Sequence, residues 1–111
     1  MTILKFYEKE RESFQKEYEL KLTDQEAQTI YRKLLRHFKI SCPWKTIRFW
    51  GTQEKGRSYI HGSIKLPHNP SLGLLVHETA HKKVAKHTKK LMTLMKRMFA
   101  YCKKKNYWRK N

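Results

Sequence analysis

Apolar residues recur at helical spacing along much of the chain. The clearest run lies between residues 24 and 38, where six side chains share one face: Ala27, Ile30, Tyr31, Leu34, Leu35 and Phe38. The TDQE segment at 23–26 is a capping box directly before this face. A second amphipathic pattern covers about residues 88–105, with lysines opposite an apolar face formed by Leu91, Leu94, Met95, Met98, Phe99 and Cys102. Both patterns predict helices that bury one face in a core.

The other predicted elements are a first helix, two strands and a third amphipathic segment. Residues 1–20 mix aromatic and charged side chains, and pairs such as Glu12 and Lys16 favour a helix with a thin apolar stripe. The segments KTIRFWG (45–51) and RSYIHGSIKLP (57–67) predict strands that TQEKG joins as a short hairpin. Gly62 is expected to bend the second strand. We expect a small antiparallel sheet of about three strands.

The segment SLGLLVHETAHKK at 71–83 is the most apolar helix candidate. Asn69 and Pro70 precede it and suit the N-cap and the first helical position. With 111 residues, the chain has room for one core and one domain, residues 1–111. The predicted fold class is α+β, with helices packed on the small antiparallel sheet and this helix in the centre.

The HETAH sequence at 77–81 lies inside that helix. His77 and His81 are four residues apart, so both imidazoles project from one face and can reach a single Zn²⁺ at about 2.0–2.1 Å. Glu78 can approach a water on the ion and act as the general base for attack on a carbonyl. About 0.02 such motifs are expected by chance from the His and Glu content of the chain. The motif predicts a zinc site, and the alternative is a pair of partly exposed helical histidines.

A third protein ligand is expected because catalytic zinc usually has three. No Asp or Glu follows Glu78, which leaves His87 and Cys102 as the downstream residues of ligating type. Cys102 falls on the apolar face of the last helix, where core packing is its expected role. His87 is therefore the preferred third ligand.

The position of His87 requires a break in the helix. An unbroken helix would turn His87 about 120° away from His81 and about 9 Å along the axis. We therefore predict that the helix breaks between Lys83 and His87, although neither Gly nor Pro stands there. His61 and His68, just before the motif helix, are the alternative third ligands.

The order of these elements resembles small SprT-like zinc metallopeptidases and related short zincins of bacteria and phages. The resemblance runs through a helix, a hairpin, GSIKLP, the HETAH helix, and HTKKL opening a basic last helix, over about residues 24–105. It implies a minimal zincin domain with one Zn²⁺ that hydrolyses peptide bonds in a protein or peptide substrate. His87 takes the third-ligand role, and the strand from Ser58 to Leu66 borders the cleft, where an extended substrate backbone can pair with it. Thr88 and Leu91 depart from the family pattern, which has glycine and an aromatic residue there.

The spacing HETAHKKVAKH also fits the metzincin pattern. Val84 occupies the place of the turn glycine of that pattern, and no Met-turn segment is evident. The SprT-like resemblance is therefore preferred.

The charge of the chain points to polyanions. The net charge is +17, and residues 82–111 hold twelve Lys or Arg and no Asp or Glu. The C-terminal segment combines cations with aromatic rings, which suits single-stranded nucleic acid. Its candidate nucleic-acid-binding residues are Lys103, Lys104, Lys105, Tyr107, Trp108 and Arg109. A solvated basic face is the alternative interpretation.

The remaining sequence features concern location and rival functions. The N-terminus becomes charged too early for a signal peptide, and no stretch approaches the roughly 20 apolar residues of a membrane span. With two distant cysteines expected as thiols, we predict a cytoplasmic protein without a membrane partner.

Two alternative functions compete with the peptidase interpretation. One is a nucleic-acid-binding protein with a structural or degenerate zinc site, and the other is a protein-interaction module without catalysis.

Overall fold

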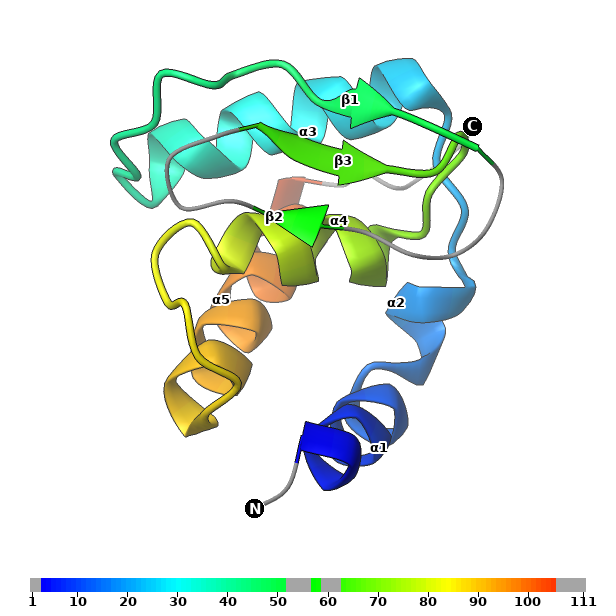
Figure 1. Ribbon diagram of the computed structural model, residues 1–111, viewed down its shortest axis with the longest axis vertical. Coiled ribbons are helices and arrows are strands. Elements are labelled where there is room, and N and C mark those ends of the chain that lie inside the picture. The colour runs from blue at the N-terminus through cyan, green and yellow to red at the C-terminus, as the bar shows by residue number, and fades with distance from the viewer. Residues whose placement is uncertain (1–2, 52–56, 59–62, 106–111) are drawn as a thin grey trace.

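The computed structural model describes residues 3–51, 57–58 and 63–105 and forms an α+β fold (Figure 1). The helices are α1 (Ile3–Ser13), α2 (Gln15–Glu19), α3 (Asp24–His37), α4 (Leu72–Ala80) and α5 (Lys89–Lys105). The strands are β1 (Arg48–Phe49), β2 (Arg57–Ser58) and β3 (Ile64–Leu66). Helix α4 contacts α2, α3, α5, β2 and β3, and all nine of its residues are buried. The motif helix is therefore the central element, as predicted.

The sheet is mixed, so the prediction of an antiparallel sheet is wrong in part. Its order is β1-β3-β2, with β3 antiparallel to β2 but parallel to β1. The predicted hairpin between residues 45–51 and 57–67 does not form; instead β2 and β3, both within 57–67, pair with each other. Because the chain reverses inside this segment, β3 returns in the direction of β1 and pairs with its free edge. Gly62 lies outside the described residues.

Helix α3 begins as the sequence predicts. The Thr23 side chain accepts a hydrogen bond from the Glu26 N–H at 3.1 Å, and the Glu26 carboxylate accepts one from the Thr23 N–H at 2.8 Å. Two of the unpaired N–H groups at the helix start are satisfied in this way. The apolar face of α3 is buried in the core that also contains the apolar face of α5.

Helix α4 begins later than predicted. Ser71, not Asn69, is the N-cap, and its hydroxyl accepts a hydrogen bond from the Leu74 N–H at 3.0 Å. Asn69 adopts a left-handed backbone with φ 51°, and the Pro70 carbonyl accepts from the Leu22 N–H. Asn69 and Pro70, which the sequence pattern assigned to the helix start, therefore lie before α4, and Pro70 contacts the segment that precedes α3.

Helix α4 also ends before the predicted break. Ala80 is its last residue and His81 is the C-cap, whereas the sequence placed the break after Lys83. The Lys82 and Lys83 N–H groups bond to carbonyls three residues back, which tightens the last turn. The chain then leaves the helix axis and reaches His87 before α5 begins. The prediction that the helix breaks before His87 is confirmed.

A glycine allows α2 to lie against α4. A Cβ added to Gly73 would stand 2.5 Å from Cγ of Tyr18, so the aromatic ring packs directly on the α4 backbone. This contact places the Tyr18 hydroxyl beside Glu10 of α1, to which it donates a hydrogen bond at 2.7 Å. None of the described helices is long and apolar enough to cross a membrane.

Candidate metal centre

Three histidine side chains converge where α4 ends. His77 lies in the last turn of α4, His81 caps it, and His87 precedes α5. The Nε2 atom of His81 is 3.0 Å from Nε2 of His77 and 3.2 Å from Nε2 of His87. Two nitrogens bound to one tetrahedral zinc at 2.0–2.1 Å are about 3.3–3.4 Å apart. The separations therefore match a shared ion to within a few tenths of an ångström, and the group could hold a metal ion.

Hydrogen bonds at the opposite ring nitrogens orient the first two imidazoles. His77 Nδ1 lies 2.5 Å from Oε1 of Glu10, and His81 Nδ1 lies 3.0 Å from the Val84 carbonyl oxygen. A carbonyl and a carboxylate only accept, so each Nδ1 carries the hydrogen and, in the neutral ring, each Nε2 presents a lone pair. Two lone pairs facing each other at 3.0 Å cannot form a hydrogen bond. A cation between them satisfies both.

The electrostatics favour the neutral form of His81 and His87. Burial is the main cause that lowers the pKa of His81 to about 4, and the neighbouring His77 adds to it. Burial and His77 also lower the pKa of His87. Because metal ions bind the unprotonated imidazole, a lowered pKa leaves the lone pairs available at neutral pH.

Glu10 is the part of this centre that the sequence analysis missed. Its side chain is 1% exposed, and Oε1 accepts from both His77 and Tyr18. A carboxylate on the outer nitrogen of a ligating histidine fixes the tautomer and makes the ring a better ligand. The available signal was its place between Phe6 and Phe14 at four-residue spacing, a carboxylate within an apolar stripe. Because the apolar stripe of residues 1–20 is thin, the sequence did not indicate that α1 contributes Glu10 to the site.

Glu78 is a buried carboxylate beside the cluster. It is 6% exposed, and within the part of the chain that the structure describes no hydrogen bond or ion pair satisfies it. Burial raises the pKa of Glu78, the Glu10 carboxylate adds to this rise, and His77 opposes it. Buried carboxylates normally have partners, so an unpaired one calls for a water or a ligand. The residues present therefore fit a metal centre with a base next to it.

Tyr7 was also missed. Its hydroxyl lies 3.1 Å from Nε2 of His87, and its ring centroid is 5.0 Å from that of His87 and 5.9 Å from that of His77. Burial, followed by the Glu78 and Glu10 carboxylates, raises the pKa of Tyr7, so the phenol stays protonated. Nothing in the sequence singled this residue out, because α1 and α4 meet only in the folded chain.

The alternative ligands do not join the cluster. His68 is half exposed, and its Nδ1 lies 2.6 Å from a carboxylate oxygen of Asp24. Cys102 is fully buried in the core, where burial raises the pKa of its thiol to about 12, so core packing is confirmed. His61 lies outside the described residues.

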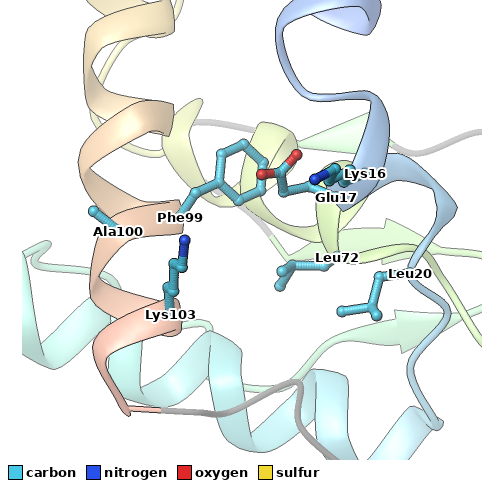
Figure 2. A pocket seen from close by; sticks show the side chains of 7 residues that line it. All are labelled: Lys16, Glu17, Leu20, Leu72, Phe99, Ala100 and Lys103. Atoms are coloured by element: carbon cyan, nitrogen blue, oxygen red, sulfur yellow. The ribbon is translucent and has the colours of Figure 1, made fainter.

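The predicted nucleic-acid residues are described only in part. Lys103, Lys104 and Lys105 are exposed at the end of α5, whereas Tyr107, Trp108 and Arg109 lie outside the described residues. Figure 2 shows Lys103 and Phe99 of α5 on one side of a cavity of about 370 Å³, facing Lys16 and Glu17 of α2. This cavity carries both signs of charge, so its lining does not select an anion.

Comparisons with known proteins add no relative. The sequence matches no protein-family model, no curated protein and no solved structure. The arguments for function therefore come from the residues of the centre.

Proposed function

We propose that the protein is a zinc-dependent peptidase whose centre consists of His77, His81, His87 and Glu78. The convergence of three Nε2 atoms beside a buried carboxylate that no described residue hydrogen-bonds carries this proposal. The order of elements, with the motif on a central helix beside a small sheet and the third histidine before α5, supports a minimal zincin of SprT-like type.

In this proposal the three histidines bind the metal and Glu78 transfers the proton. Bound at the three histidines, zinc would polarise the peptide carbonyl and increase the acidity of a water molecule. The Glu78 carboxylate accepts a proton from the attacking water while the water oxygen bonds to the carbonyl carbon. The same proton then passes to the leaving amine as the C–N bond breaks. Burial favours this exchange because it brings the pKa of Glu78 closer to neutrality.

The sheet offers a place for an extended substrate. β2 is an edge strand, and α4 contacts both β2 and β3. An extended peptide can add to such an edge through backbone hydrogen bonds. Within the segment from Ser58 to Leu66, the proposed rim of the cleft, β2 offers a free edge whereas β3 is paired on both sides; residues 59–62 lie outside the described part.

The test compares Glu78→Gln with the parent protein on an unfolded, fluorescently labelled protein substrate. We expect Glu78→Gln to bind one zinc per chain and to lose at least about 10²-fold in kcat/KM, the contribution of a positioned general base. Glu17→Gln, a partly exposed carboxylate on α2, is the matched control and keeps its activity. Equal proteolysis by Glu78→Gln and the parent would refute the assignment.

A second candidate function is nucleic-acid binding, with the metal centre in a structural role. It is supported by a groove of about 260 Å³ between α1 and α5, called here the lysine groove. Its lining contains three lysines and no acidic residue: Phe6, Lys9, Ser13, Lys89, Met92, Thr93 and Lys96. Such a groove suits the phosphates of a single strand.

Salt-dependent binding tests this second candidate. Affinity for single-stranded DNA should fall steeply with salt, and Lys9→Ala with Lys96→Ala should reduce the log–log slope by about 0.7 per lost phosphate contact. Lys45→Ala, an exposed lysine outside the groove, is the control. Binding that is insensitive to salt would contradict the electrostatic account.

A further inference from the structure

Tyr7 holds a position that the proposed chemistry of His77, His81, His87 and Glu78 does not use. Among the described residues, its hydroxyl is the one group other than a histidine nitrogen within hydrogen-bonding distance of a converging Nε2 atom, at 3.1 Å from His87. The residue as a whole is 40% exposed, so Tyr7 lies between the centre and solvent. A substrate reaching the histidines from solvent therefore meets Tyr7.

The neighbours of Tyr7 hold its ring in place from one side. Phe6, the preceding residue of α1, is 2% exposed and its ring makes an edge contact with His87 at 5.2 Å. The Tyr7 ring itself contacts His87 edge-on and lies tilted over His77. The α1 backbone and two histidine rings thus direct the hydroxyl towards Nε2 of His87.

The hydroxyl and a metal ion compete for the same lone pair. A ligating His87 must present a lone pair at Nε2, and in that tautomer the Tyr7 hydroxyl is the donor of this hydrogen bond. Once an ion occupies that lone pair, the O–H group loses its acceptor and remains next to the centre. A donor without an acceptor beside the reacting atoms is suited to charge that develops during reaction.

We propose that the Tyr7 hydroxyl donates a hydrogen bond to the carbonyl oxygen of the scissile peptide. This inference rests on the proposed peptidase function. The carbonyl oxygen gains negative charge when water adds to the carbon, and loses it when the C–N bond breaks. Tyr7 keeps its proton throughout, while Glu78 moves the proton from water to the amine. The hydrogen bond is strongest in the transition state, so it contributes to kcat more than to binding of the substrate.

Tyr7→Phe removes the hydroxyl and keeps the ring contacts with His77 and His87. We expect zinc content and thermal stability to stay at the parent level, KM to change little, and kcat to fall by about 10²–10³-fold, as for loss of one such donor. Tyr101→Phe is the matched control, because Tyr101 stacks on His37 at 3.9 Å on a different part of the molecule. It should retain the parent kcat.

A binding measurement without turnover completes the test. A phosphinate peptide carries its charge where the reacting carbonyl oxygen develops one, so zinc-loaded Tyr7→Phe should bind it at least about 10-fold more weakly. The corresponding substrate peptide, which lacks the phosphinate charge, should bind equally well to the Glu78→Gln variant and to the double variant Glu78→Gln with Tyr7→Phe. If the parent hydrolyses peptides and Tyr7→Phe matches it in kcat and phosphinate affinity, the role of Tyr7 is refuted alone. If the zinc-loaded parent neither hydrolyses peptides nor binds the phosphinate, the peptidase proposal is refuted together with it.

Discussion

The buried carboxylate of Glu10 gives the sharpest prediction about the centre. Its Oε1 accepts hydrogen bonds from His77 Nδ1 at 2.5 Å and from the Tyr18 hydroxyl at 2.7 Å. A glutamine carbonyl oxygen has two lone pairs and can accept both bonds. Glu10→Gln therefore removes the charge and keeps the geometry, whereas Glu10→Ala removes the acceptor as well.

Glu10→Gln and Glu10→Ala should differ in their effects on zinc affinity and on the free energy of unfolding. Loss of an outer partner of a ligating histidine typically lowers metal affinity 10–100-fold, about 1.4–2.7 kcal/mol. We expect Glu10→Gln to lose zinc affinity in this range without loss of metal-free stability, because a buried charge is costly to the fold. Glu10→Ala leaves the Tyr18 hydroxyl, in a side chain that is 9% exposed, without its acceptor and should cost a further ~1–3 kcal/mol of unfolding free energy.

Zinc titration against a competing chelator measures the affinity, and urea unfolding with and without zinc measures both stabilities. The added stability from zinc should fall by the same free energy as the affinity, because only the folded chain forms the site. Glu8→Gln, an exposed carboxylate on the same helix, is the control. The reasoning fails if Glu10→Gln binds zinc as tightly as the parent, or if Glu8→Gln weakens binding equally.

Two further predictions concern packing and pH. Gly73→Ala places a methyl group 2.5 Å from Cγ of Tyr18, so it should lower the unfolding free energy by ~1–3 kcal/mol and weaken zinc binding. Urea unfolding and zinc titration measure the two effects. If both values equal those of the parent protein, the close packing of Tyr18 on Gly73 is contradicted. In metal-free protein, the pKa of His81 is about 4 when folded and 6.5 when unfolded, so its contribution to stability is complete above pH 6.5 and is lost as the pH falls towards 4. The full difference is ~3 kcal/mol of unfolding free energy, and the partial exposure of His81 reduces the expected loss to about half of that. Urea unfolding between about pH 7 and pH 4 should show this slope, and His81→Gln should flatten it.

The local pattern was sufficient for the features that depend on near neighbours. The capping box of Thr23 and Glu26, the apolar faces of α3 and α5, and the i, i+4 placement of His77 and His81 follow from helix geometry alone. The convergence of His87 was also predictable in outline, since no other downstream histidine or carboxylate exists. These features depend on spacing along the chain, which the sequence states directly.

Other features depended on which elements meet in the fold. The parallel pairing of β1 with β3 arises because the chain reverses inside residues 57–67, and the early end of α4 arises from the hydrogen bonds of the turn that follows Ala80. Glu10 and Tyr7 reach the histidines across 67 and 80 residues of sequence, a separation at which periodicity carries no information. The sequence by itself determined the ligand types and their helical spacing. Tertiary packing of α1 and α2 on α4 decided which carboxylate orients His77 and which hydroxyl faces the centre.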